Sequence, residues 1–110
     1  MRIDLSGHHV EITEAMRQAV EQKLSKIASH YPQLEACGVI LTVERNDQHV
    51  EITTHYMGDD FSANAKNGDM YTALGNAVKK LDAELAKKKG AQKAKRHQTV
   101  APSDPDKLAS

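Results

Sequence analysis

The 110-residue sequence has no tryptophan, one phenylalanine and one cysteine. A single cysteine cannot form a disulfide within the chain, so no disulfide framework holds this fold together. Cys37 stands just before an apolar segment, which favours a buried, unreactive thiol over a nucleophile. Because aromatic residues are only 4% of the chain, we expect a small core built mainly from aliphatic side chains.

The sequence also lacks any apolar run of about 18 residues, the length that a membrane-spanning helix needs. Its first residues, MRIDL, do not resemble the apolar core of a signal peptide. We therefore expect a cytoplasmic protein with no membrane partner. The length suits one domain and a tail.

Charge is balanced over the whole chain, with 15 basic and 15 acidic residues, but it is unevenly distributed. Residues 1–65 contain five Lys or Arg and ten Asp or Glu, whereas residues 66–110 contain ten and five. This polarity is typical of a protein that presents one face to an anion and keeps another face away from it.

Apolar periodicity predicts four strands and two helices. Alternation predicts strands in residues 2–6, ended by Gly7, and around 39–43, 50–56 and 61–65, with turns at 46–47 and 58–59. Helical spacing predicts one helix that Thr13 caps and Pro32 stops, and a second over 69–89 that Gly90 ends.

The order β-α-β-β-β-α, with one apolar face on each element, predicts an α+β fold. Its four-stranded sheet would carry both helices on one face. The other sheet face would be open, polar and mixed in charge. We expect residues 1–90 to form this domain and residues 91–110 to form a flexible tail, basic at first and then rich in Pro, Asp and Ser.

Lysines on the two predicted helices are the main candidates for a binding site. On the second helix, Lys79, Lys80 and Lys87 fall within about a third of the circumference, opposite the apolar stripe. The full set of candidate RNA-binding residues is Lys23, Lys26, Lys79, Lys80, Lys87, Lys88 and Lys89. An alternative hypothesis is a small protein-interaction or generic RNA-binding domain whose lysine face is merely solvated.

Motifs for catalysis or cofactor binding are missing. The chain has no Gly-x-Ser-x-Gly, glycine-rich phosphate loop or His-Glu-x-x-His, so we expect no enzyme, no cofactor and no small-molecule substrate. His8 and His9 are adjacent and should point apart, and one cysteine is too few for structural zinc. No metal site is therefore predicted.

Helix lysines without stacking aromatics favour recognition of RNA through phosphates and shape rather than bases. Two segments add a more specific indication, namely VEITEAMR at 10–17 and DMYTAL at 69–74. Together with the order of elements, they resemble the short form of the ribosome hibernation-promoting factor family, which is related to the ribosome-associated inhibitor. The resemblance covers residues 1–89.

This resemblance implies a non-enzymatic protein that binds the small ribosomal subunit and its rRNA. It would occupy the channel for mRNA and tRNA and silence idle ribosomes under stress. The resemblance implies rRNA contacts from the residues that match basic positions of the family, which are Lys23, Lys26, Lys80, Lys87 and Lys89. Lys79 is basic where relatives often are not. A ribosome-dimerising protein is a further partner that the resemblance suggests, and whether the chain promotes or blocks pairing of ribosomes stays open.

Overall fold

The computed structural model describes the backbone of residues 1–96 and the side chains of residues 1–90. Its elements, in chain order, are β1 (Arg2–His8), α1 (Glu14–His30), β2 (Ala36–Glu44), β3 (Asp47–Tyr56), β4 (Asp59–Asn67) and α2 (Met70–Arg96). The predicted β-α-β-β-β-α order is confirmed.

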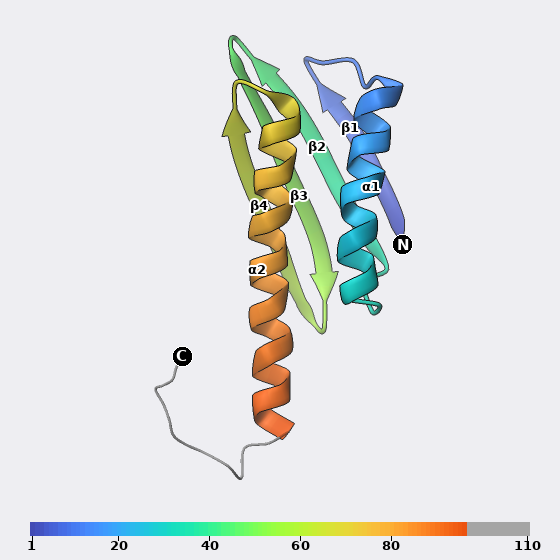
Figure 1. Ribbon diagram of the computed structural model, residues 1–110, viewed down its shortest axis with the longest axis vertical. Coiled ribbons are helices and arrows are strands. Elements are labelled where there is room, and N and C mark those ends of the chain that lie inside the picture. The colour runs from blue at the N-terminus through green and yellow to red at the C-terminus, as the bar shows by residue number, and fades with distance from the viewer. Residues whose placement is uncertain (97–110) are drawn as a thin grey trace.

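The four strands form one mixed sheet in the order β1-β2-β3-β4. β1 pairs with β2 in parallel, and the other neighbours are antiparallel. A parallel pair needs a crossover between its strands, and α1 provides it. Both helices cover the same face of the sheet, and α2 extends beyond the sheet's edge (Figure 1). The predicted α+β class and architecture are therefore confirmed.

The core lies between the helices and the inward-facing strand positions. Aliphatic residues at alternate strand positions meet the apolar stripes of α1 and α2, as the periodicity predicts. Its largest fully buried side chains are Leu24, Leu41, Ile52, Leu74, Leu81, Leu85, Val20, Val39, Val50 and Cys37. Burial raises the pKa of the Cys37 thiol, which agrees with the prediction of an unreactive cysteine.

Local signals define both ends of α1. The hydroxyl of Thr13 accepts a hydrogen bond of 3.1 Å from the backbone N–H of Met16, as an N-cap residue should. The helix ends at His30, two residues before Pro32. Proline lacks an N–H and disfavours helical geometry in the residue before it. Both predicted boundaries are confirmed.

The prediction that Gly90 ends the second helix was wrong, because α2 continues to Arg96. The residues after Gly90 are Ala, Gln, Lys and Arg, all good helix formers. One glycine weakens such a run without stopping it. The flexible tail predicted from residue 91 thus starts in a helical segment, and residues 97–110 lie outside the described part of the chain.

Three smaller boundaries also differ from the predictions. β1 passes through Gly7 to His8, because Gly7 and His8 keep their pairing with Leu41 and Thr42 of β2. The hairpin turns are Arg45–Asn46 and Met57–Gly58, one residue earlier than predicted. Met57 therefore lies in a turn and not on the open sheet face, and both residues of that turn have positive φ, 51° and 87°.

Candidate nucleic-acid interface

A groove between α1 and α2 collects three of the seven candidate lysines. Lys23 and Lys26 reach it from α1, and Lys79 reaches it from α2. The ammonium group of Lys23 lies 4.0 Å from the point where a Cβ on Gly75 would stand. A Cβ at position 75 would make an ordinary van der Waals contact with this ammonium group, so Gly75 and Lys23 are neighbours across the groove.

None of these three ammonium groups is neutralised by the protein itself. Within residues 1–90, neither an ion pair nor a hydrogen bond engages the side-chain ammonium groups of Lys23, Lys26 or Lys79. The remaining lining residues are Ile27, His30, Gly75, Val78 and Asp82. Like charges held close together without ion-pair partners attract an external anion, and phosphate is one that several lysines can share.

A fourth candidate lysine, Lys89, bonds to His30, one of the residues that line the groove. The ammonium group of Lys89 donates a hydrogen bond of 3.2 Å to the carbonyl oxygen of His30. It also lies 5.4 Å from the ring centre of Tyr31, in a cation–π contact. Because Lys89 is exposed, these contacts fix its direction and leave part of the ammonium group open to solvent.

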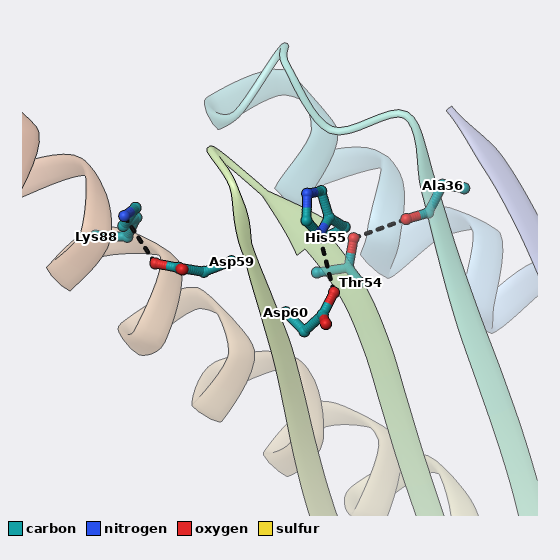
Figure 2. Close-up of polar contacts among 6 residues, drawn as sticks. All are labelled: Ala36, Thr54, His55, Asp59, Asp60 and Lys88. Carbon is teal, nitrogen blue, oxygen red and sulfur yellow. Dashed lines mark hydrogen bonds and ion pairs between the residues drawn. The ribbon is translucent and has the colours of Figure 1, made fainter.

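Two candidate lysines turn to the opposite side of α2, towards β4. Lys80 donates a hydrogen bond of 2.8 Å to the carbonyl oxygen of Asn64. Lys88 lies 2.7 Å from a carboxylate oxygen of Asp59, at the start of β4 (Figure 2). The side chain of Lys88 is only 21% exposed. The ammonium groups of Lys80 and Lys88 therefore help to fasten α2 to β4, the edge strand of the sheet.

Lys87 is exposed and has an acidic partner on its own helix. Its ammonium group lies 3.8 Å from Glu84, and its side chain is 78% exposed. An exposed pair of this kind is weak and easily exchanged for another anion. The predicted grouping of Lys79, Lys80 and Lys87 on one solvent face is thus only partly reproduced: all three are exposed, but their ammonium groups have different surroundings.

Sequence reasoning missed several residues that shape the groove. Gly75 lines the groove but was not considered for the site, although an isolated glycine in a helical pattern often has a packing reason. Tyr31 and Asp82 were not considered for the site, and the hydroxyl of Tyr31 donates a hydrogen bond of 2.9 Å to the Asp82 carboxylate. They are 51 positions apart in the sequence, so no local pattern signals this contact.

The open face of the sheet offers no platform for stacking bases. Two of the three tyrosines, Tyr31 and Tyr56, are buried in the core. On the hairpin, His55 pairs with Asp60 at 2.8 Å, and the hydroxyl of Thr54 donates to the carbonyl of Ala36 at 2.7 Å (Figure 2). Recognition by stacked aromatics, as in many single-strand readers, has no support here.

The histidine pair at the end of β1 differs from the prediction. The rings of His8 and His9 do not point apart but stack, with their centres 4.6 Å apart and their planes inclined by 10°. The reason is the left-handed backbone of His9, whose φ is 63°. Within residues 1–90, no three His, Cys, Asp or Glu side chains gather as metal ligands would.

Comparison with known proteins identifies the family. The model of the family described as Sigma 54 modulation protein / S30EA ribosomal protein matches residues 3–93. This chain belongs to that family. The match spans β1 to α2 and includes all seven candidate lysines, and the resemblance noted from the two sequence segments is confirmed.

Individual S30EA relatives carry consistent names. The chain is 38% identical over 104 residues to the ribosome hibernation promoting factor of Azotobacter vinelandii, covering 94% of this chain and 96% of the relative. It is 34% identical over 97 residues to the factor of that name from Escherichia coli K12, covering 88% and 100%. Neither name describes an enzyme, in agreement with the prediction that the chain is not a catalyst.

Solved structures of S30EA-like proteins share the fold. A ribosomal subunit interface protein from Coxiella burnetii superposes with a TM-score of 0.78 at 27% identity, covering 82% of this chain and 99% of that one. The N-terminal domain of Thermus thermophilus Protein Y superposes with a TM-score of 0.71 at 30% identity, covering 76% of this chain and 94% of that one.

Within the described residues, no helix is both long and apolar enough to cross a membrane.

Proposed function

We propose that this protein is a ribosome hibernation factor that binds rRNA of the small subunit in the channel used by mRNA and tRNA. By occupying that channel it would inactivate idle ribosomes in the cytoplasm under stress. Family membership and the names of the relatives support a ribosomal role. The observation that carries the RNA contact is the groove of Lys23, Lys26 and Lys79, whose ammonium groups form no ion pair within residues 1–90.

The seven lysines would contribute in three ways. The groove lysines Lys23, Lys26 and Lys79 would hold phosphates directly, and Lys89 would extend the same path. Lys87 would exchange Glu84 for a phosphate. Lys80 and Lys88 would mainly place α2 on the sheet and add a background of positive charge. Such contacts position an RNA backbone without reading its bases.

A charge-reversal pair tests the contact side. Lys79→Glu reverses a groove lysine, and Lys66→Glu reverses an exposed lysine on the open sheet face, so both variants change the net charge equally. We expect Lys79→Glu to weaken co-sedimentation with purified small subunits by at least about tenfold, and Lys66→Glu by no more than about twofold. Equal losses would show that only net charge matters and that the groove is not the interface.

A second experiment tests the ribosomal role itself. A lysate from stationary-phase cells, separated on a low-salt sucrose gradient, should show the protein in ribosomal fractions. Purified protein should also inhibit translation in a cell-free system, and the Lys79→Glu variant should inhibit it less. Protein found only at the top of the gradient would favour the alternative, a small protein-interaction domain with a solvated lysine face.

Pairing of ribosomes is the finer part of the proposal. The weakly acidic composition of residues 97–110 supports a factor that permits pairing by a dimerising partner protein. This segment lies outside the described residues, so the proposal rests on its composition alone.

A further inference from the structure

The groove that we assign to RNA also contains one carboxylate, that of Asp82. Asp82 follows Lys79 by three residues on α2, a spacing that places two side chains next to each other on a helix surface. Even so, no ion pair joins Asp82 to a lysine within residues 1–90. This carboxylate is bonded to a different group.

That group is the hydroxyl of Tyr31, just beyond the end of α1. It donates a hydrogen bond of 2.9 Å to the Asp82 carboxylate and lies 3.3 Å from the backbone carbonyl oxygen of the same residue. Tyr31 is only 5% exposed, and its ring packs edge-on against Tyr56 with the centres 5.6 Å apart. The phenol is thus held in one direction by its surroundings.

The hydroxyl of Tyr31 also stays protonated. Burial, followed by the hydrogen bond and charge of Asp82, raises the pKa of Tyr31 to about 12. Tyr31 therefore remains a donor at every physiological pH. Because the Asp82 carboxylate already accepts this hydrogen bond, it has less tendency to form an ion pair with a solvated lysine such as Lys79.

We infer that Tyr31 is a positioning residue whose hydroxyl holds the Asp82 carboxylate away from the groove lysines. All three ammonium groups then stay available to RNA phosphates. The inference rests on the proposed function, because it concerns the same groove. Without the hydroxyl, the carboxylate of Asp82 would turn to Lys79 and neutralise one of the three charges.

The test is Tyr31→Phe, made both in the natural chain and in an Asp82→Asn background. The substitution keeps the ring, its contact with Tyr56 and the cation–π contact of Lys89, and removes only the hydroxyl. In the natural background we expect affinity for a labelled single-stranded RNA oligonucleotide to fall by about three- to tenfold, with the salt slope smaller by about one contact. In the Asp82→Asn background, Tyr31→Phe should change affinity by less than about twofold.

Two further variants keep the inference falsifiable if Tyr31→Phe folds poorly. Asp82→Glu retains the charge but carries the carboxylate past the phenol, so it should weaken binding as Tyr31→Phe does. Tyr56→Phe removes a hydroxyl from a neighbouring buried ring that makes no bond to Asp82, and should leave affinity unchanged. Circular dichroism and thermal unfolding establish that each variant is folded.

The results separate two failures. Equal losses from Tyr31→Phe in both backgrounds, or no loss in either, would overturn the positioning role. All variants are also measured against purified small subunits. If the oligonucleotide shows the expected pattern but the natural chain does not bind subunits, the positioning role stands and the ribosomal proposal fails.

Discussion

The ammonium group of Lys88 lies 2.7 Å from a carboxylate oxygen of Asp59 and joins the second half of α2 to the β3–β4 hairpin. The hydrogen bond and the charge of Lys88 lower the pKa of the Asp59 carboxyl. A carboxyl whose pKa is lowered by folding stabilises the fold above its unfolded pKa, and this contribution is lost as pH falls through the folded pKa.

Lys88→Met should therefore return the pKa of Asp59 towards its ordinary value. An NMR titration of the side-chain carboxyl carbons measures this shift directly, with Asp69 as the internal control. The pKa of Asp69 is lowered chiefly by hydrogen bonds from Thr72, which the substitution does not touch. Equal movement of both residues would indicate a general effect of charge and contradict the specific pair.

Removal of charge at Lys79 and at Lys88 should affect RNA binding unequally. Lys79→Gln deletes an ammonium group with no partner in the described structure, whereas Lys88→Gln deletes one that Asp59 already neutralises. We expect Lys79→Gln to weaken binding to small subunits by about three- to tenfold and Lys88→Gln by less than about threefold. Co-sedimentation at one fixed salt concentration measures both, and a larger loss for Lys88→Gln would contradict the assignment.

Salt dependence should report the number of phosphates that the lysines neutralise. For about four to six contacts with RNA, log K should fall against log salt concentration with a slope of roughly −3 to −5. Affinity for small subunits, measured between low and physiological salt, provides the slope. A slope near zero would mean that protein or apolar contacts dominate, and the lysine hypothesis would fail.

Much of the fold follows from local patterns in the sequence. Alternation in strands such as Val50–Tyr56 and the Thr13 cap specify elements through contacts within a few residues. The parallel pairing of β1 with β2, by contrast, depends on where α1 returns the chain. The end of α2 depends on the helix propensity of Gly90 together with that of its neighbours. The prediction considered Gly90 alone and therefore ended the helix too early.

The candidate site was predictable only as a list of lysines. Helical spacing showed that Lys79 and Lys80 are exposed, but not that one faces α1 and the other bonds to Asn64 of β4. The same limit applies to Tyr31 and Asp82, whose contact joins distant parts of the chain. These relations arise from tertiary packing, so no periodicity in the sequence carries them.

Two glycine substitutions should change stability in opposite directions. Gly90 lies inside α2 and a Cβ there would meet no atom within 4 Å, so Gly90→Ala should stabilise the helix by up to about 1 kcal/mol. Gly58 has a φ of 87°, which alanine adopts only with strain, so Gly58→Ala should destabilise by about 1–2 kcal/mol. Urea unfolding followed by circular dichroism compares the two. A loss of stability in Gly90→Ala would contradict a continuous helix at this position.

Removal of residues 97–110 should leave the pairing of ribosomes unchanged. This segment contains two Asp and one Lys. Its charge is too small for it to displace RNA or a dimerising partner from the ribosome. A shorter truncation product that ends at Gly90 is the control, because it also removes Lys93, Lys95 and Arg96 from the helical end of α2. We expect this control to bind small subunits somewhat less tightly at low salt. Sucrose gradients run with the dimerising partner present measure the ratio of paired to single ribosomes. A large rise in paired ribosomes after removal of 97–110 would show that the segment inhibits pairing.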